Sequence, residues 1–248
     1  MKDKIAELAA LMRDSRSTCF FGGAGVSTES GIPDFRSADG LYSEKWGELS
    51  PEEIISHDFF FSSPEEFYSF YRERMIYENA APGVAHRALA KLEDAGLITA
   101  VITQNIDGLH TAAGSSRVFE LHGSVLNNTC TECGRHFPRS YVTECAPALP
   151  KCDLCGGLVK PDVTLYGEQL PTGVFEEAAH LVLCSDLLIV AGTSLGVYPA
   201  ANLVKYFEGD LVIINRDPTP YDRRADIVIH AGVGEVFSAL LLELGLGL

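Results

Sequence analysis

The sequence predicts an α/β protein in which a parallel β-sheet is covered by helices on both faces and carries a smaller second domain. Apolar, β-branched strands alternate with amphipathic helices over most of the chain, and this alternation is typical of a parallel sheet. An aromatic stretch, 37–87, and a cysteine-containing polar stretch, 126–160, interrupt it. With 248 residues, the chain is long enough for one large core and a small satellite domain.

The spacing of apolar residues predicts the elements of the larger domain in order. Residues 1–15 place Ile5, Leu8 and Met12 on one helical face, and the apolar run 18–21 follows as a strand. We expect further strands at 98–103, 118–121, 186–191, 211–214 and 227–230. We expect helices over about 85–95 (ended by Gly96), 174–183 and 199–207, and a last helix from about 234.

The two interrupting stretches form the predicted small domain. Residues 37–87 are rich in aromatic side chains and lack a strand pattern. Within them, Ser63 followed by Pro64 and two glutamates is a helix start. We interpret this stretch as a helical module folded over the glycine-containing loop that follows the first strand.

The charge and the two ends of the chain limit the partners that we expect. Nineteen basic and 34 acidic residues give a net charge of -15. This charge disfavours phosphate contacts with nucleic acid and is compatible with lysine-bearing peptides, although acidity also serves solubility. The N-terminus lacks the apolar core of a signal peptide, and the C-terminal helix is too short and too polar to span a membrane. We therefore expect a cytoplasmic protein that binds neither nucleic acid nor membrane.

Four of the seven cysteines predict a metal site. They form two Cys-x-x-Cys pairs separated by residues 134–151: Cys130 with Cys133, and Cys152 with Cys155. This spacing is typical of a zinc ribbon, and four thiolates leave no open coordination position, so we expect a structural zinc ion. The alternative is a pair of redox-active dithiols. Such dithiols typically occur as a single Cys-x-x-Cys pair in a thioredoxin-like pattern. We expect two of the other cysteines in the core and one in a loop: Cys19, Cys184 and Cys145, respectively.

A glycine-rich loop follows the first strand. Gly22, Gly23 and Gly25 come directly after the apolar run, and residues 27–30 have the composition of a helix start. Backbone N–H groups at such a turn can approach a pyrophosphate closely. A plain turn explains these glycines equally well, because the full Gly-x-Gly-x-x-Gly spacing is missing. The charged and aromatic continuation, 31–36, favours a binding loop, since a simple turn does not need it.

Polar residues follow several expected strands at the point where each strand ends. They are Gln104, Asn105 and Asp107 after 98–103, His122 after 118–121, Gly192, Thr193 and Ser194 after 186–191, and Asn215 after 211–214. Taken singly, each of them is also explained as a helix cap or a turn residue. Together they lie at one edge of one sheet, where parallel sheets bind their ligands. We therefore expect them to hold ribose and phosphate oxygens.

These segments occur in the order and spacing of the sirtuin family of NAD-dependent protein deacylases, which the chain resembles over essentially its whole length. The motifs are GAGVS from Gly23, GIPDFR from Gly31, QNID from Gln104, HG at His122, the two Cys-x-x-Cys pairs, YGE at Tyr166 and GTSL from Gly192. The resemblance implies a Rossmann-like NAD-binding domain formed by residues 1–36, 88–125 and 160–248. It also implies a small domain formed by the helical module, 37–87, and the zinc ribbon, 126–159.

The resemblance further implies roles for individual residues. The residues placed around NAD are Gly23, Ala24, Gly25, Thr28, Ile32, Phe35, Arg36, Gln104, Gly192, Thr193, Ser194 and Asn215. Those that line the nicotinamide pocket are Asn105, Ile106 and Asp107, together with Ile32 and Phe35. An acetylated-lysine peptide would pair with a strand-like stretch by β-augmentation. That stretch contains Val163, Leu165, Tyr166 and Gly167.

The resemblance also implies the chemistry. The acyl-lysine carbonyl oxygen attacks the ribose carbon as nicotinamide leaves, which gives an alkylimidate joined to ADP-ribose. The implied catalytic residues are Asn105 and His122, with His122 as general base on a ribose hydroxyl and Phe35 keeping water from the reactive carbon. The expected products are the free lysine, nicotinamide and O-acetyl-ADP-ribose.

One departure from the family bears on the acyl group. Members that remove acidic acyl groups carry Tyr-x-x-Arg, whereas this chain has Tyr68 and Tyr71, with Arg72 adjacent. The arginine that would pair with a distal carboxylate is therefore missing, and we expect an acetyl or other uncharged acyl group. Alternative activities are removal of longer uncharged acyl groups and protein mono-ADP-ribosyl transfer. A nucleic-acid-binding zinc ribbon is a third alternative, favoured only by Arg135, Arg139, Lys151 and Lys160.

Overall fold

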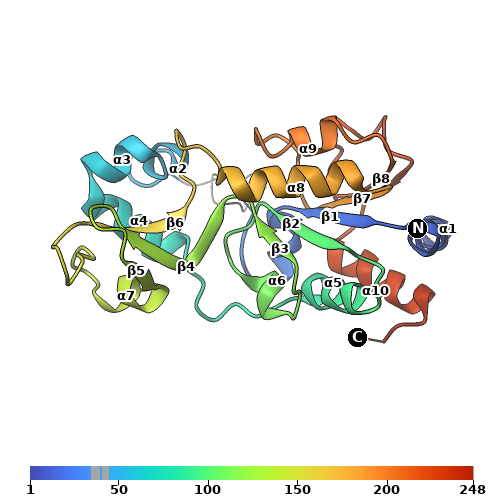
Figure 1. The fold of residues 1–248 in the computed structure, drawn as a ribbon, viewed down its shortest axis with the longest axis horizontal. Helices are drawn as coiled ribbons and strands as arrows, with labels where there is room; N and C mark the ends of the chain where they lie inside the picture. The colour runs from blue at the N-terminus through green and yellow to red at the C-terminus, as the bar shows by residue number, and fades with distance from the viewer. Residues whose placement is uncertain (35–39, 41–44, 248) are drawn as a thin grey trace.

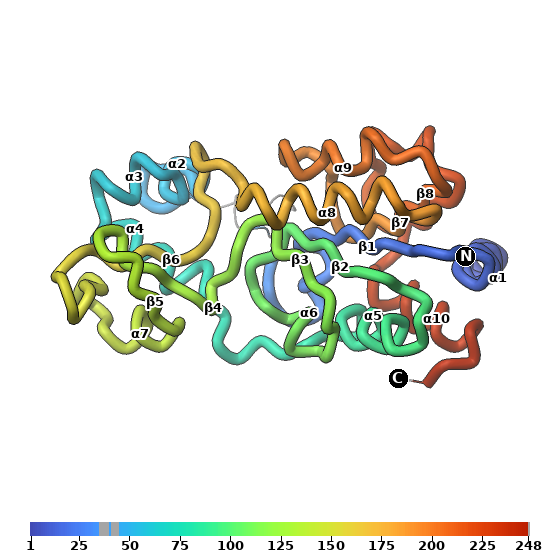
Figure 2. The backbone as a smooth tube through the Cα atoms, in the orientation of Figure 1, coloured from blue at the N-terminus to red at the C-terminus, as the bar shows by residue number. Residues whose placement is uncertain are grey.

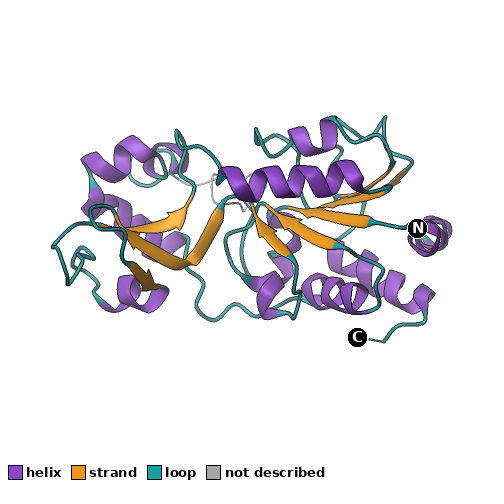
Figure 3. Ribbon diagram, viewed as in Figure 1, coloured by secondary structure: helices purple, strands orange, loops and turns teal. Residues whose placement is uncertain are grey.

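The structure is a computed structural model that describes residues 1–34, 40 and 45–247. In this part of the chain, two β-sheets mark a larger and a smaller part of the molecule (Figures 1 and 3). The larger sheet has six parallel strands in the order β3-β2-β1-β7-β8-β9. The smaller sheet has three antiparallel strands in the order β5-β4-β6. The predicted α/β class is confirmed.

All predicted strands of the larger sheet are present, with ends within two residues of the expected ones. They are β1 (Thr18–Gly22), β2 (Ala100–Thr103), β3 (Val118–Glu120), β7 (Leu187–Ala191), β8 (Asp210–Ile214) and β9 (Ile227–Ile229). Gly22 lies beside both Thr103 and Ala191, and Ala191 lies beside Ile214. The carboxyl ends of the strands are therefore level along one edge, and the strand order reverses between β1 and β7.

Helices cover both faces of this sheet (Figure 1). On one face lie α1 (Lys2–Asp14), α5 (Val84–Asp94) and α10 (Val233–Leu244), with the short α6 (Leu109–Ala112) near them; on the other lie α8 (Thr172–Cys184) and α9 (Asn202–Lys205). The neighbours Phe20 and Phe21 belong to opposite cores. This alternation is the reason that the strands read as continuous apolar runs, because both of their faces are buried.

The smaller part combines segments that are far apart in the sequence. It contains α2 (Pro51–Ile54), α3 (His57–Ser62), α4 (Pro64–Arg74), β4 (Gly123–Cys130), β5 (His136–Pro138), α7 (Arg139–Glu144) and β6 (Val159–Val163). The tube in Figure 2 shows the cyan helices beside the later, yellow-green strands. The helix predicted at Ser63 begins there, with Pro64 in its first turn. Phe60, Phe67 and Tyr71 are fully buried among these elements. The predicted domain boundaries, at 125–126 and 159–160, fall inside β4 and β6. Continuous strands therefore join the two parts.

Three local expectations are wrong. Residues 27–30 do not begin an α-helix: Ser27 lies between two 3-10 turns, η1 (Ala24–Val26) and η2 (Thr28–Ser30), and η2 ends at Gly31 with a φ of 81°. The helix expected at 199–207 is only α9, because residues 198–201 form turns and the helix begins at Asn202. Cys184 is exposed, since Ala178 and Val182 set the buried face of α8 and a residue two positions after Val182 points to nearly the opposite side. Cys19 is buried as predicted, and Cys145 is half-buried directly after α7.

No helix of the described chain is both long and apolar enough to cross a membrane.

Candidate active site

A cavity of about 820 Å³ lies at the carboxyl edge of the larger sheet. It includes the loops after β1 and β7, where the strand order reverses and parallel sheets bind ligands, and its volume is typical of cofactor sites. The predicted residues that line it are Gly23, Ala24, Gly25, Thr28, Ile32, Gln104, Asn105, Ile106, His122, Val163, Leu165, Tyr166, Gly167, Gly192, Thr193, Ser194 and Asn215. Asp107 lines an adjoining second cavity instead. Phe35 and Arg36 lie outside the described residues.

The loops after β1 and β7 touch each other backbone to backbone. The Gly25 amide donates to the Gly192 carbonyl oxygen at 2.9 Å, and a Cβ atom on Gly25 would lie 2.7 Å from the Gly192 Cα atom. A third loop joins them, because Gln104 Nε2 donates to Thr193 Oγ1 at 3.0 Å. This close approach needs glycine, and it leaves a polar cradle made of backbone and hydroxyl groups. Such a cradle suits phosphate and ribose oxygens.

His122 lies in the cavity wall with a defined tautomer. Its Nδ1 atom is 2.8 Å from the carbonyl oxygen of Gln104, which can only accept a hydrogen bond, so Nδ1 carries the proton and Nε2 carries a lone pair. Burial lowers the pKa of His122, and the Gln104 carbonyl opposes this effect in part. The imidazole is therefore neutral near pH 7, and its Nε2 atom can take up a proton.

The residue after His122 fixes the position of the imidazole. Gly123 has a φ of 74°, and a Cβ atom there would overlap the carbonyl oxygen of Asp162 on β6. The His122 carbonyl oxygen accepts from the Thr164 amide at 2.9 Å. β6 thus packs directly against the backbone that carries His122, and only glycine permits this approach.

A buried hydrogen-bond network orients Asn105 and Asp107. Ser27 Oγ donates to Asp107 Oδ2 at 2.7 Å and accepts from Asn105 Nδ2 at 2.9 Å. His86 Nδ1 accepts from the Gly83 amide at 3.1 Å, so its Nε2 carries the proton and donates to Ser27 Oγ at 3.3 Å. The Ser27 hydroxyl is therefore saturated and holds both side chains in place.

Sequence reasoning missed part of this network. Ser27 stands inside the GAGVS segment, where the sequence indicates only the start of a helix, and His86 lies on α5 without any local signal. Asp107 Oδ1 also accepts from the Leu109 amide at 2.9 Å, although the residue that caps α6 is Gly108 and not Asp107. Glu120, at the end of β3, was missed too: burial, and next the neighbouring Asp107, raise its pKa to about 7.

The stretch from Val163 to Glu168 forms another wall of the cavity. The Tyr166 amide donates to the Ile55 carbonyl oxygen at 3.0 Å, and the Tyr166 carbonyl oxygen accepts from the His57 amide at 2.9 Å. This stretch is therefore paired with the helical module on one side. Ile55 and Met75 of that module also line the cavity, and the sequence did not single them out.

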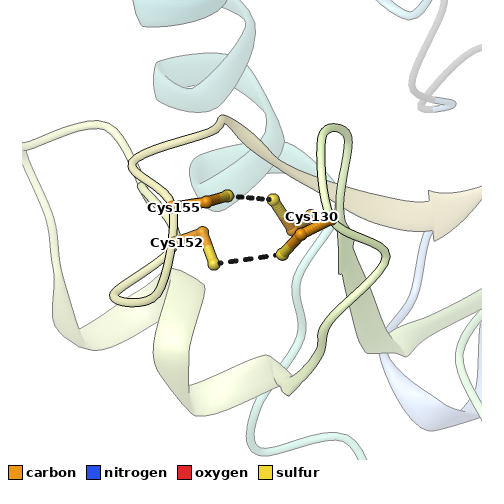
Figure 4. A group of neighbouring side chains, drawn as sticks. Cys130, Cys152 and Cys155 are labelled. Carbon is orange, nitrogen blue, oxygen red and sulfur yellow. Dashed lines mark hydrogen bonds between the residues drawn. The ribbon is translucent and has the colours of Figure 1, made fainter.

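The four predicted cysteines meet in the smaller part (Figure 4). Their sulfur atoms all lie within 4.8 Å of one another, with 3.5 Å between Cys130 and Cys155 and 3.6 Å between Cys133 and Cys152. A disulfide would require about 2 Å, whereas a tetrahedral zinc ion with Zn–S bonds of about 2.3 Å separates its ligands by about 3.8 Å. The cluster therefore fits a structural zinc ion.

Basic side chains near this cluster have carboxylate partners. Arg135 pairs with Asp153 at 2.8 Å, and Lys160 pairs with Glu168 at 3.1 Å. Two of the four basic residues that favoured nucleic-acid binding are thus engaged within the protein. This arrangement argues against a phosphate-binding surface on the ribbon.

The fold and the site together define an α/β protein of the dinucleotide-binding type that carries a four-cysteine zinc ribbon. A family model described as the Sir2 family matches residues 23–199. The chain is 52% identical over 245 residues to an NAD-dependent protein deacetylase of Clostridium tetani, covering 98% of this chain and 99% of the relative. It is 50% identical over 241 residues to the protein of the same name in Clostridium acetobutylicum, covering 96% and 98%. The chain belongs to the Sir2 family.

Solved structures of Sir2 proteins have the same fold. One, in complex with a deacetylated p53 peptide and 3'-O-acetyl ADP ribose, is 41% identical to this chain with a TM-score of 0.91, covering 98% of this chain and 99% of that one. Another, in complex with a p53 peptide and NAD+, is 42% identical with a TM-score of 0.87, covering 96% and 98%.

Proposed function

We propose that this chain is an NAD-dependent protein-lysine deacetylase that releases nicotinamide and O-acetyl-ADP-ribose. The observation that carries this proposal is the neutral His122, whose Nε2 lone pair lies in the wall of one cavity. That cavity extends from the glycine cradle of the larger sheet to the stretch 163–168. It can therefore bring a dinucleotide and a peptide to the same base, and relatives at about half identity are named for this activity.

NAD fits the cradle between the loops after β1 and β7. The glycines let the two loops pack so closely that a Cβ atom on Gly25 would meet the backbone of Gly192, and Gln104 with Thr193 supplies polar groups beside them. The same reasoning extends to the other residues assigned to NAD, namely Gly23, Ala24, Thr28, Ile32, Ser194 and Asn215. When bound, NAD supplies the ADP-ribosyl group, and the bond to nicotinamide is the one that breaks. In this proposal, Asp107 accepts a hydrogen bond from the carboxamide.

His122 acts as the general base. Its Nδ1–H stays bonded to Gln104 while Nε2 takes the proton of a ribose hydroxyl, and the carbonyl partner stabilises the charged ring. Asn105 is held through Nδ2 by Ser27 and lines the same cavity as His122. The zinc ion takes no part in the reaction, because four thiolates complete its coordination.

The acyl group is uncharged. Arg72, the only cation next to the Tyr68–Tyr71 pair in sequence, donates to the carbonyl oxygens of Val142 at 2.9 Å and Ala148 at 2.7 Å. It therefore ties α4 to α7 and is not placed to pair with a distal carboxylate. Ile55, Met75 and Ile106 give the cavity an apolar wall instead. We expect kcat/KM for an acetyl-lysine peptide to exceed that for the succinyl-lysine peptide by at least about tenfold, and the reverse order would refute this assignment.

The proposal also assigns the peptide-binding residues, the two domains and the location of the protein. Val163, Leu165, Tyr166 and Gly167 bind the acetylated-lysine peptide, with Gly167 exposed and both backbone groups of Tyr166 engaged elsewhere. Residues 1–36, 88–125 and 160–248 act as the NAD-binding domain, and 37–87 with 126–159 as the small domain. A cytoplasmic location fits four cysteines that must remain reduced to bind zinc.

The proposal is tested with an acetyl-lysine peptide incubated with and without NAD. Mass spectrometry should show loss of the acetyl group and formation of acetyl-ADP-ribose only when NAD is present. A gain of ADP-ribose on the peptide would instead indicate mono-ADP-ribosyl transfer. His122→Ala should abolish deacetylation while calorimetry still detects NAD binding, and the exposed His180→Ala serves as the matched control. Full activity of His122→Ala would remove the general-base role.

A further inference from the structure

Three side chains of α3 lie beside the proposed peptide-binding stretch and take no part in the proposed reaction. They are His57, Asp58 and Phe61, which we call the α3 cluster. The His57 amide donates to the Tyr166 carbonyl oxygen at 2.9 Å, and a Cβ atom on Gly167 would lie 3.8 Å from the His57 Cβ atom. Gly167 lines the active-site cavity, whereas the α3 cluster lines neither cavity. The cluster therefore lies directly outside the peptide wall of the cavity.

The first turn of α3 fixes the position of the cluster. Ser56 Oγ accepts from the Phe59 amide at 3.3 Å and so caps the helix. Phe60 is fully buried and anchors the helix in the core of the smaller part. His57 and Phe61 are four residues apart, which places them on the same helical face, and their ring centroids lie 4.9 Å apart at an interplanar angle of 56°. The two rings form an aromatic surface that needs little ordering when a ligand binds.

This aromatic surface is open to solvent and has a carboxylate at its edge. Phe61 is 51% exposed, and the Asp58 side chain is fully exposed. His57 Nδ1 lies 3.1 Å from Asp58 Oδ1. Because a carboxylate only accepts, Nδ1–H is the donor, and Asp58 Oδ2 can accept from a further group. A single exposed phenylalanine indicates little, but an aromatic face with a carboxylate beside it is the arrangement that binds a guanidinium group.

We propose that the α3 cluster is a subsite for an arginine side chain that flanks the acetyl-lysine of the peptide substrate. This inference rests on the proposed function, because it requires a peptide paired with the stretch 163–168. The guanidinium stacks on the Phe61 ring and donates to the Asp58 carboxylate. Its planar fork suits both contacts better than the compact ammonium group of lysine. Since successive side chains of an extended peptide point to opposite sides, the cluster is reached only from particular positions of the peptide.

The test uses acetyl-lysine peptides in which a single arginine is moved from three residues before the acetyl-lysine to three residues after it. Each peptide is compared with one that carries citrulline at the same place, which keeps the shape and removes the charge. With the zinc-loaded chain, kcat/KM should be about three- to tenfold higher for arginine at one position, or at two positions on the same side of the peptide. The difference should lie in KM with kcat unchanged, because the subsite is remote from the reacting groups.

The position dependence separates the subsite from general attraction. The net charge of -15 attracts a cationic peptide wherever its arginine stands, whereas the α3 cluster acts at a defined position. Asp58→Asn and Phe61→Ala should each lower the arginine-to-citrulline ratio at that position toward the ratio at the others. Glu7→Gln is the matched control, because it also removes one exposed negative charge. It lies on α1, at the opposite end of the molecule from α3 (Figure 1), and should keep the preference.

Three results would overturn the subsite. One is an equal arginine-to-citrulline ratio at all positions. Another is a positional preference that both Asp58→Asn and Phe61→Ala retain. The third is a preference for norleucine over arginine at the favoured position, since the contact would then be apolar and independent of Asp58. Failure of the proposed function is recognised separately, because no acetyl-lysine peptide of the series would then be deacetylated in the presence of NAD.

Discussion

The buried His110 allows us to predict how the free energy of unfolding changes at acidic pH. This side chain is 1% exposed, and neither ring nitrogen has a hydrogen-bond partner among the described residues. Its ring lies 4.7 Å from that of His86 and 6.1 Å from that of Phe20, centroid to centroid. Burial, and next the neighbouring His86, lower the pKa of His110 to about 3. The folded protein therefore keeps this imidazole neutral far below the pH at which the unfolded chain protonates it.

The sign and size of the effect follow from linkage. Above pH 6.5 the ring is neutral in both states, so its titration adds nothing. Between about pH 6.5 and pH 3 the unfolded chain binds a proton that the folded protein does not, so the free energy of unfolding falls as the pH falls. At pH 5, about 1.5 pH units below the pKa of the unfolded chain, the free energy of unfolding is lower by about 2 kcal/mol. For a chain of this length, that loss corresponds to a Tm lower by about 4–8 °C.

The assay compares zinc-loaded wild type with His110→Leu by urea unfolding at pH 8 and pH 5. At pH 8 the variant should be as stable as the wild type or more stable, because a leucine removes two unpartnered nitrogens that cost about 1–3 kcal/mol each. From pH 8 to pH 5 it should lose about 2 kcal/mol less than the wild type, while other titrating groups cancel in the comparison. Equal losses in the two proteins would refute the reasoning.

Three further predictions concern the site. The acid limb of kcat/KM should have an apparent pKa below 6.5, because burial lowers the pKa of His122 and only the neutral ring accepts a proton; a pH profile with its limb above 6.5 would contradict this. Cys133→Ser should lower zinc content and Tm, whereas the exposed Cys184→Ser should change neither, as metal analysis and calorimetry would show. Gly25→Ala should weaken NAD binding at least about tenfold, because the new Cβ meets the backbone of Gly192. Gly173→Ala, which has open space, is the control, and equal NAD affinities measured by calorimetry would count against the cradle.

The sequence predicts the sheet and the zinc ligands well because their signals are local. An apolar run such as Leu187–Ala191 is buried on both faces, and two Cys-x-x-Cys pairs have few other uses. Ends of parallel strands must meet at one edge, which is why His122 and Asn105 could be brought together before the structure was known.

Other features depend on contacts between distant segments. The Ser27 hydroxyl joins a residue of the first loop to His86 on α5 and Asp107 after β2, and no spacing in the sequence indicates this. The direction of the last turn of α8 decides that Cys184 is exposed, and a cysteine carries no pattern that shows it. Met75 reaches the cavity from the helical module only because the smaller part folds over the sheet edge.

One strand connects the proposed base with the zinc ribbon. β4 begins at Gly123, directly after His122, and ends at Cys130, the first metal ligand. At about 3.3 Å per residue, its eight residues span about 26 Å. The metal site is thus far from the reacting groups. It holds one end of β4, and His122 directly precedes the other end. Without zinc, the Cys130 end of β4 would be held only by its pairing with β5 and β6, so an ion that touches neither NAD nor peptide would add to the rigidity of the strand that follows the base.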